Sequence, residues 1–185
     1  MNLQDAIHSR RTAHSWTNEP VNQDILERAL RAAQMAPCHR LTWPWRFTLP
    51  GPVARNALYE LGVQLKAARR AEQPSEALRD RLRQKLLHPA LVVVSQVLDE
   101  DLDRQNEDYA ACACAIQNLS LSVTADGLHS KWSTGGLTRH KETYEILSVP
   151  QDEERIIGFV WIGTPARLPN EPERLPLEQV VRSVP

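Results

Sequence analysis

Two apolar runs constrain the fold of this chain more than any other feature of its sequence. Residues 89–94 read PALVVV and residues 156–162 read IIGFVWI, without the polar alternation of a strand that has one face in water. A continuous apolar run of this length predicts a strand that is buried on both faces. Such a strand needs other elements on each side, so the chain has to place helices around a central sheet.

Several helical patterns supply those covering layers. A long apolar helix is predicted over residues 105–125, where small Ala and Cys side chains permit close helix packing, and Gly127 ends it. Further helices are predicted over residues 2–9, 23–35, 53–71, 75–87 and 139–147, and further strands over residues 45–49 and 129–133. The expected fold class is α+β, with helices around a small mixed sheet, in a single domain that spans residues 1–185.

Composition argues against several classes of partner. The chain has 22 Lys and Arg against 23 Asp and Glu, a net charge of −1, so no overall field draws it onto nucleic acid or an anionic membrane. No stretch approaches the roughly 20 apolar residues of a membrane span. Three cysteines without metal-ligand spacing fit reduced thiols in a reducing compartment. We expect a cytoplasmic protein with no nucleic-acid or membrane partner.

The two helices predicted over residues 53–71 and 75–87 carry many basic side chains. Their charged positions include Lys66, Arg69, Arg70, Arg79, Asp80, Arg81 and Arg83. Because acids are interleaved with the bases, we interpret this surface as a solvated helix face and not as a nucleic-acid patch.

Common catalytic and metal-binding motifs are missing. The sequence has no GxSxG nucleophile motif, no glycine-rich P-loop and no GxGxxG dinucleotide fingerprint. Its six histidines show neither HxH nor HExxH spacing. We therefore predict no metal site and no classical Rossmann cofactor domain.

Three other segments carry residue types that suit an anionic or flat ligand. Residues 9–14 (SRRTAH) combine arginines, whose planar forks suit phosphate, with hydroxyl donors, although basic residues there also suit the end of the first helix. In residues 36–47, two tryptophans flank a proline as a rigid wall, which core packing also explains, and His39 follows a helix-ending proline. In residues 127–137, glycines allow backbone to approach a flat ligand.

These segments resemble those of the nitroreductase family. SRRTAHSW (9–16) is similar to the family's opening basic motif, and APCHRLTWPWRF (36–47) resembles its Ala-Pro-Ser loop before a Pro-Trp pair. EDYAACACAIQNLSLSVTADGL (107–128) resembles its Gln-Asn-Leu helix, and IIGFVWIGTP (156–165) its closing strand and turn. The four occur in family order, so the resemblance covers nearly the whole chain. It implies a nitroreductase-like, mainly antiparallel sheet and a homodimer.

The resemblance also implies a site. Carried over by position, FMN contacts come from Arg10, Arg11, Thr12, His14, Met35, Cys38, His39, Trp132, Ser133, Thr134 and Arg174. Residues 10–12 reach the phosphate and ribityl chain, and Met35 and His39 lie near the ring system of that flavin. Residues 132–134 contact the same flavin from the other subunit. Arg174 resembles a phosphate-contacting basic residue of larger members.

Four positions depart from the family pattern. His14 stands where Arg or Lys is usual, which makes the phosphate site weaker or sensitive to pH. Cys38 replaces Ser, Asp or Asn, and Leu41 and Trp43 replace the Asn and Gln of larger members. These changes remove polar groups from the loop that meets the isoalloxazine ring.

The implied chemistry belongs to the flavin, so no catalytic side chain is expected. A nicotinamide, NADH or NADPH, gives hydride to flavin N5 and leaves. A small oxidant, such as a nitro compound, a quinone, a flavin or an enone, then takes the electrons in a ping-pong cycle. One alternative is a flavin-binding or flavin-sensing protein of the same fold without turnover. Another is a helical interaction module whose motifs are coincidental.

Overall fold

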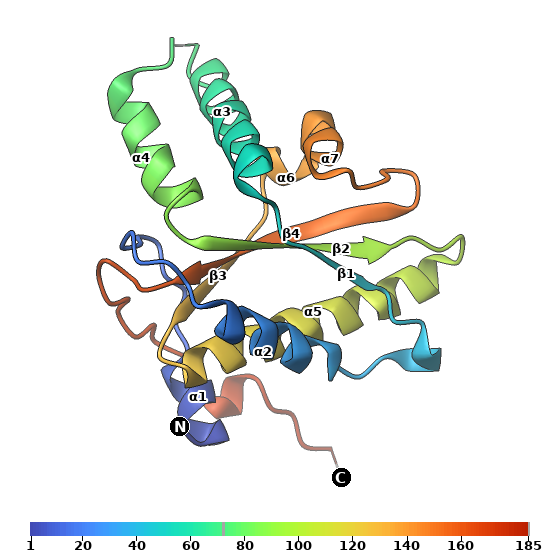
Figure 1. The fold of residues 1–185 in the computed structure, drawn as a ribbon. Helices are drawn as coiled ribbons and strands as arrows, with labels where there is room; N and C mark the ends of the chain where they lie inside the picture. The colour runs from blue at the N-terminus through green and yellow to red at the C-terminus, as the bar shows by residue number, and fades with distance from the viewer. Residues whose placement is uncertain (72, 185) are drawn as a thin grey trace.

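A four-stranded sheet forms the centre of the computed structural model, which describes residues 1–71 and 73–184 (Figure 1). Its strand order is β1-β2-β4-β3, and all three ladders between neighbouring strands are antiparallel. A single parallel bridge joins Thr12 to Ser130 outside the named strands. The expected α+β fold with a mainly antiparallel sheet is confirmed. The strands are β1 (Trp45–Thr48), β2 (Ala90–Val97), β3 (His129–Ser133) and β4 (Glu154–Gly163).

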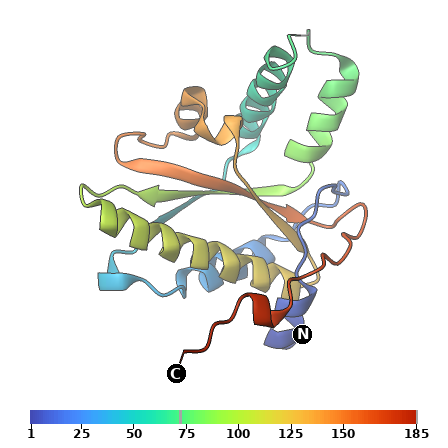
Figure 2. The same ribbon diagram turned by 180° about the vertical axis from the view of Figure 1, so that it is seen from behind.

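Helices cover both faces of this sheet, as Figures 1 and 2 show. One face carries α1 (Leu3–Ser9), α2 (Gln23–Gln34) and α5 (Leu102–Ala125). The other face carries α3 (Pro52–Ala68), α4 (Glu76–Leu86), α6 (Gly136–Arg139) and α7 (Lys141–Leu147). Two short 3-10 turns complete the elements, η1 (His39–Leu41) and η2 (Leu177–Gln179).

The central strands are buried on both faces, as their composition predicts. In β2, Val92 and Val94 pack into the core beneath α2 and α5, whereas Leu91 and Val93 pack toward α3 and α7. Successive side chains of a strand point to opposite faces, so one apolar run serves both core layers. The fully buried Cys112 and its small neighbours in α5 let this helix lie close against the sheet.

A β-bulge interrupts the ladder between β2 and β4. The register shifts between Val94 and Ser95, which leaves Ile157 as the extra residue of β4. As a result, Ile157 and Val160 pack into the same core layer although they are three residues apart. The bulge changes which side chains of β4 point to each face of the sheet. An uninterrupted apolar run tolerates this change because both faces of the strand meet an apolar layer.

The predicted element boundaries differ from the observed ones in two places. The helix expected over residues 139–147 begins at Lys141, after a separate short helix over Gly136–Arg139, because His140 is extended and the Thr143 hydroxyl donates to the Leu137 carbonyl across the break. The long helix starts at Leu102 and not at residue 105, because the Asp101 carboxylate accepts the first free backbone N–H groups.

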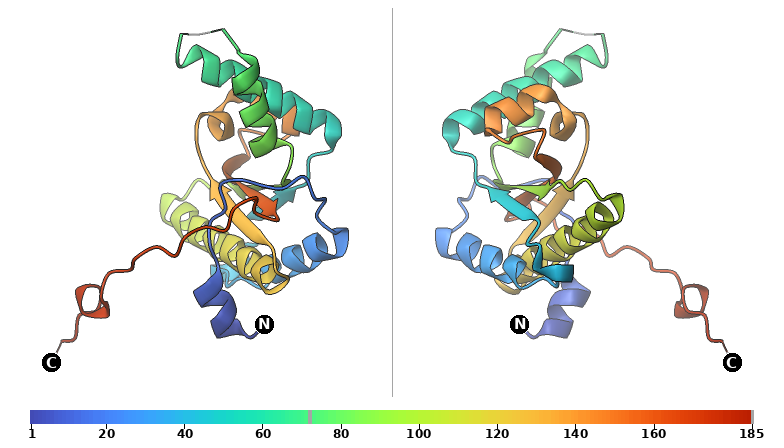
Figure 3. Two further views of the ribbon diagram at one scale, coloured as in Figure 1. Left: turned by 90° about the vertical axis from the view of Figure 1, so that its left-hand side faces the viewer. Right: turned by 90° about the vertical axis from the view of Figure 1, so that its right-hand side faces the viewer.

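The C-terminal segment leaves the body of the chain, as Figure 3 shows. It starts beside the N-terminal segment, where Ala166 N–H donates to the Ser15 carbonyl and Trp16 forms a bridge with Pro165. Beyond this point its apolar side chains stay exposed, among them Leu175, Leu177, Val180, Val181 and Val184. These exposed apolar side chains contrast with the start of the segment, which contacts the N-terminal segment.

Candidate flavin site

A pocket of 460 Å³ lies between the α3–α4 pair and the loop that follows β3. Three predicted site residues line it, namely His14, Ser133 and Thr134. Its apolar lining comes from Leu65, Leu82, Leu137, Phe159 and Trp161, and Gly135 and Gly136 add backbone. A second pocket of 510 Å³ lies along β4 and shares Thr134 with the first. The first pocket is the candidate site because it gathers predicted residues from distant parts of the sequence.

The N-terminal segment is held at this pocket by β3. Thr12 bridges Ser130, and Ala13, which is fully buried, donates its N–H to the Ser130 carbonyl at 3.2 Å. These contacts bring His14 Nδ1 to 3.4 Å from Lys131 Nζ. Burial lowers the pKa of Lys131, and the charge of Lys85 lowers it further. This side of the pocket is therefore basic and partly desolvated, which suits an anionic group.

The loop after β3 offers an open backbone to the pocket. Gly135 has φ 158 and ψ −163, a conformation that is essentially restricted to glycine, and open space surrounds its Cα. Its N–H already donates to Thr138 Oγ1 at 3.0 Å, so this group is not free to bind an anion. The Ser133 hydroxyl is engaged as well, because it accepts from Trp161 Nε1 at 2.9 Å. The loop thus has fixed internal bonds and an accessible surface.

The two predicted phosphate-binding arginines have different surroundings. The Arg11 guanidinium donates to the carbonyls of His8 and Arg10 and pairs with Glu171 at 2.9 Å. These contacts match the alternative to phosphate binding given above for residues 9–14, in which a basic residue suits the end of the first helix. The half-buried Arg10 follows α1 as its C-cap residue, and its side chain makes none of these bonds. Arg174 lies in the exposed C-terminal segment and does not line the pocket.

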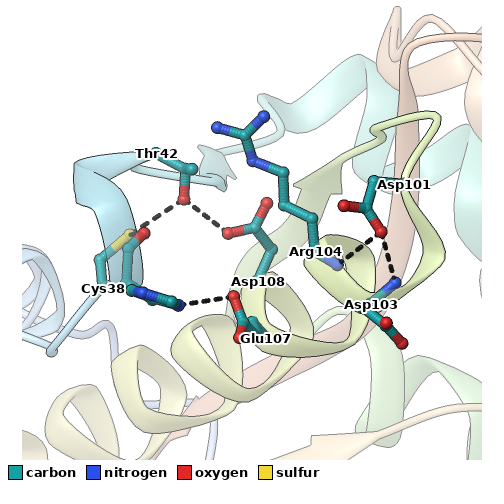
Figure 4. A network of polar contacts seen from close by, with 8 residues as sticks. Cys38, Thr42, Asp101, Asp103, Arg104, Glu107 and Asp108 are labelled. Carbon is teal, nitrogen blue, oxygen red and sulfur yellow. Dashed lines mark hydrogen bonds and ion pairs between the residues drawn. The ribbon is translucent and has the colours of Figure 1, made fainter.

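The loop around Cys38 is held by a polar network (Figure 4). Cys38 Sγ lies 3.1 Å from Thr42 Oγ1 and accepts the Trp43 N–H at 3.2 Å. The Thr42 hydroxyl donates to the buried carboxylate of Asp108 at 2.5 Å. His39 Nδ1 lies 2.7 Å from a carboxylate oxygen of Glu107. The network attaches the loop to the first turns of α5.

The same loop contains unusual backbone. Arg40, Leu41 and Trp43 all have positive φ, between 47° and 56°, although none of them is glycine. Each such residue costs roughly 1–3 kcal/mol and persists only where surrounding contacts enforce it, often at ligand sites. Apolar side chains nearby are exposed, with Met35 at 80% and Leu41 at 66%. This surface has the properties of a contact region and not of a core.

The predicted site residues fall into two groups at opposite ends of α5. His39 pairs with Glu107 near the start of this helix, whereas Arg28 pairs with Asp126 at its end, just before β3 begins. The 19 residues from Glu107 to Asp126 span about 28 Å at roughly 1.5 Å per residue. Within one chain, the structure therefore unites His14 with Ser133 and Thr134, and does not bring Met35, Cys38 and His39 to them.

Comparison with known proteins identifies the family. The nitroreductase family model matches residues 7–164. The chain belongs to the nitroreductase family. A Bacillus subtilis (strain 168) protein, named provisionally as the NAD(P)H nitroreductase YfhC, is 28% identical over 176 residues, which cover 95% of this chain and 90% of that one. The family prediction made from the four sequence segments is confirmed, and the helical interaction module is excluded.

Solved structures of the family share this fold. A nitroreductase-like protein from Bacillus cereus has a TM-score of 0.83 and 26% identity, with 100% of this chain and 96% of that chain covered. A Bacteroides fragilis nitroreductase with bound FMN has a TM-score of 0.74 and 23% identity, with both chains fully covered. The matched family region contains every predicted site residue except Arg174.

In this nitroreductase-family chain, Trp132 lies on the opposite face of β3 from Ser133. Its indole Nε1 donates to the Ile157 carbonyl at 3.2 Å, and the ring packs directly over Gly158. A Cβ atom at position 158 would lie 2.0 Å from Nε1, so the close approach requires glycine there. The sequence analysis did not single out Gly158, because its neighbour in space lies 26 residues away along the chain.

The sequence analysis also missed the contribution of α3 and α4 to the pocket. Lys66, Arg69, Arg70, Arg81 and Lys85 line its outer side. They are exposed, as the solvated-face interpretation expects, but they all border one cavity. The sequence pattern that indicates this shared position is the spacing of the bases, since side chains three or four residues apart lie on the same face of a helix.

Two expected absences can be compared with the described part of the chain. Among residues 1–71 and 73–184, no group of three or more metal-ligating side chains is suitably placed for a metal ion. None of the helices described there is long and apolar enough to span a membrane.

Proposed function

We propose that this chain is an FMN-dependent oxidoreductase that transfers electrons from NADH or NADPH to a small oxidant. The observation that carries the proposal is the family match over residues 7–164, which includes the pocket-lining segments on both sides of β3. Relatives are named as NAD(P)H nitroreductases, and one structural neighbour is named as FMN- and NADPH-dependent. We infer one FMN-binding domain over residues 1–185, with a nitro compound, quinone, flavin or enone as oxidant.

The pocket residues fit FMN. A flavin has a flat apolar ring system with a polar edge, and this pocket combines aromatic and aliphatic walls with the polar side chains of His14 and Lys131. Gly135 leaves open space where a side chain would block a flat ligand. Arg10 and Thr12, just before the buried Ala13, are the residues we assign to the phosphate and ribityl chain. Ser133 and Thr134 are assigned to the ring.

We propose that each FMN site is shared between two subunits, with a division that differs from the one expected from the sequence. Residues 10–14 and 132–134 come from one subunit, because Thr12 and Ser130 are bridged within one chain. Met35, Cys38 and His39 come from the partner, because α5 separates them from this group. The exposed Met35 and Leu41 and the exposed apolar tail support a homodimer.

FMN, when bound, supplies the two-electron chemistry between nicotinamide and oxidant. The chain's own residues bind and orient it, and exclude water from one face of the ring. We propose ping-pong exchange, in which the oxidized nicotinamide leaves before the oxidant enters. A cytoplasmic location is part of the proposal and rests on three free cysteines, which suit a reducing compartment.

The proposal is tested with purified protein. We expect it to carry or take up FMN, to elute as a dimer, and to oxidize NADH or NADPH when a quinone or nitroaromatic compound is added. Product-inhibition and initial-rate patterns would then establish ping-pong order. FMN binding without nicotinamide oxidation would support the flavin-sensing alternative, which the strained, altered loop at Cys38–Trp43 favours. A protein that takes up no flavin would contradict both.

His39 offers a specific prediction for the partner's part of the site. Its pair with Glu107 is exposed, so losing it should cost stability only about 0–1 kcal/mol. If the His39 imidazole also hydrogen-bonds to the flavin, His39→Ala should weaken FMN binding by roughly ten- to a hundred-fold, as expected for the loss of a hydrogen bond worth about 1.5–3 kcal/mol. Flavin fluorescence titration measures this, with Glu107→Gln as the control. Equal FMN affinity in His39→Ala and the original protein would return His39 to a structural role.

A further inference from the structure

Five basic side chains from two helices border the outer side of the candidate pocket. Lys66 lies in the last turn of α3, Arg69 and Arg70 follow this helix directly, and Arg81 and Lys85 lie along α4. With His14 and Lys131 on the opposite side, the pocket is lined by basic groups on both walls. Its described lining residues include no aspartate or glutamate. The charge of this cavity is therefore far from the balanced charge of the chain as a whole.

The five bases differ from the other arginines of the same helices. Arg79 pairs with Glu60 at 2.9 Å, and Arg83 pairs with Asp80 at 2.9 Å, so acids neutralize the face of α4 that lies away from the pocket. Within the described residues, no ion pair involves any of the five pocket bases. Among residues 1–71 and 73–184, the acids of these ion pairs thus lie on the side of α4 away from the pocket, and the pocket side is basic.

This arrangement opposes folding of the free chain. Arg81 and Lys85 are four residues apart within α4, and like charges at this spacing destabilize a helix. Lys85 also lies close enough to Lys131 for its charge to lower the pKa of that amine. Helix-end electrostatics explain bases in the last turn, but not Arg81 in the middle of α4. A bound anion would relieve the repulsion.

We propose that the α3–α4 wall is an anion subsite that selects a negatively charged reactant. The inference rests on the proposed function. Two reactants carry an anionic group that this subsite would bind: NADPH carries a 2′-phosphate, and an aromatic oxidant can carry a carboxylate. The FMN phosphate is not the proposed occupant, because its candidate ligands Arg10 and Thr12 do not line this pocket. Leu65, Leu82 and Phe159 supply apolar contact for the rest of the reactant.

The test compares two double variants of α4 in the FMN-loaded protein. Arg81→Gln/Lys85→Gln removes two charges from the pocket side. Arg79→Gln/Arg83→Gln removes the same charge from the paired side and is the control. For each protein, kcat/KM is measured for NADPH and NADH with a neutral quinone, and for 4-nitrobenzoate and 4-nitrobenzamide with one donor. FMN affinity is measured in parallel. The Tm shift caused by adenosine 2′,5′-bisphosphate is also compared with the Tm shift caused by 5′-AMP.

We expect the original protein to prefer the more negatively charged member of at least one pair. Arg81→Gln/Lys85→Gln should reduce that preference about tenfold or more, with a smaller effect at high salt, and the control should keep it. A changed NADPH/NADH ratio identifies the nucleotide phosphate, and a changed nitrobenzoate ratio identifies the oxidant. Unchanged ratios overturn the proposal, including the case in which only FMN affinity falls.

Failure of the proposed function gives a different result from failure of the subsite. If neither nucleotide is oxidized, the oxidoreductase proposal fails, and the Tm comparison still decides the subsite. A larger Tm shift with adenosine 2′,5′-bisphosphate than with 5′-AMP, lost in Arg81→Gln/Lys85→Gln only, supports it. Equal shifts with the two nucleotides in the original protein, or a difference that Arg81→Gln/Lys85→Gln retains, overturn it.

Discussion

Arg10→Ala should weaken FMN binding by roughly ten- to a hundred-fold, because it removes a charge-assisted contact worth about 1.5–3 kcal/mol from the phosphate. Riboflavin lacks the phosphate, so its affinity should stay unchanged. The loss should become smaller as salt screens the contact. Fluorescence titration with both flavins at low and high salt measures these effects. A loss shared equally by FMN and riboflavin, or insensitive to salt, would instead indicate altered packing at the end of α1.

Arg11→Ala is the control for Arg10→Ala. Arg11 donates to two carbonyls at the end of α1 and pairs with Glu171 of the C-terminal segment. We therefore expect this variant to lower the free energy of unfolding by about 1 kcal/mol, with a smaller effect on FMN affinity than Arg10→Ala. The pair separates phosphate binding from the helix-end role that the sequence left open.

Mixing Arg10→Ala with His39→Ala extends the same experiment to the shared site. If the two residues serve one flavin from different subunits, random subunit exchange leaves about a quarter of the sites with both residues intact. FMN binding at limiting concentration should then recover partly in the mixture. If both residues act from the same subunit, every site keeps one defect and no recovery occurs.

Gly158→Ala should destabilize the chain by roughly 1–3 kcal/mol, the usual cost of adding a methyl group where no space exists. The new Cβ would lie 2.0 Å from Trp132 Nε1 and 3.2 Å from the Ser133 carbonyl, so the indole has to leave its place. Moving it breaks the bond from Nε1 to the Ile157 carbonyl. Urea unfolding followed by tryptophan fluorescence measures the change.

Two further variants check this explanation. In a Trp132→Ala background the clash is absent, so Gly158→Ala should cost much less than in the original protein. Gly136→Ala adds the same methyl group where nothing lies within 4 Å, and should change stability little or raise it slightly. Equal cost of Gly158→Ala in both backgrounds would show that backbone strain, and not the indole, is responsible.

The sequence determined the parts of this protein that depend on local pattern. Burial of β2 and β4 on both faces follows from their unbroken apolar composition, and the helices follow from spacing and capping residues such as Asn22 and Asp101. Family membership was also readable, because its segments lie in order along the chain. Boundaries were less certain where a tertiary bond decides them, as at Thr143 and Leu137.

Only the tertiary structure decided which of these residues meet. His14 reaches Lys131 because Thr12 and Ala13 pair with Ser130, although 117 residues separate the two side chains in sequence. The α5 helix keeps His39 away from that group, and for this reason we propose a division of the site between subunits that differs from the expected one. The position of Gly158 beneath Trp132, and the gathering of basic side chains around one pocket, depend likewise on contacts between distant segments. Local spacing carries no information about such contacts, because they arise from the packing of whole elements.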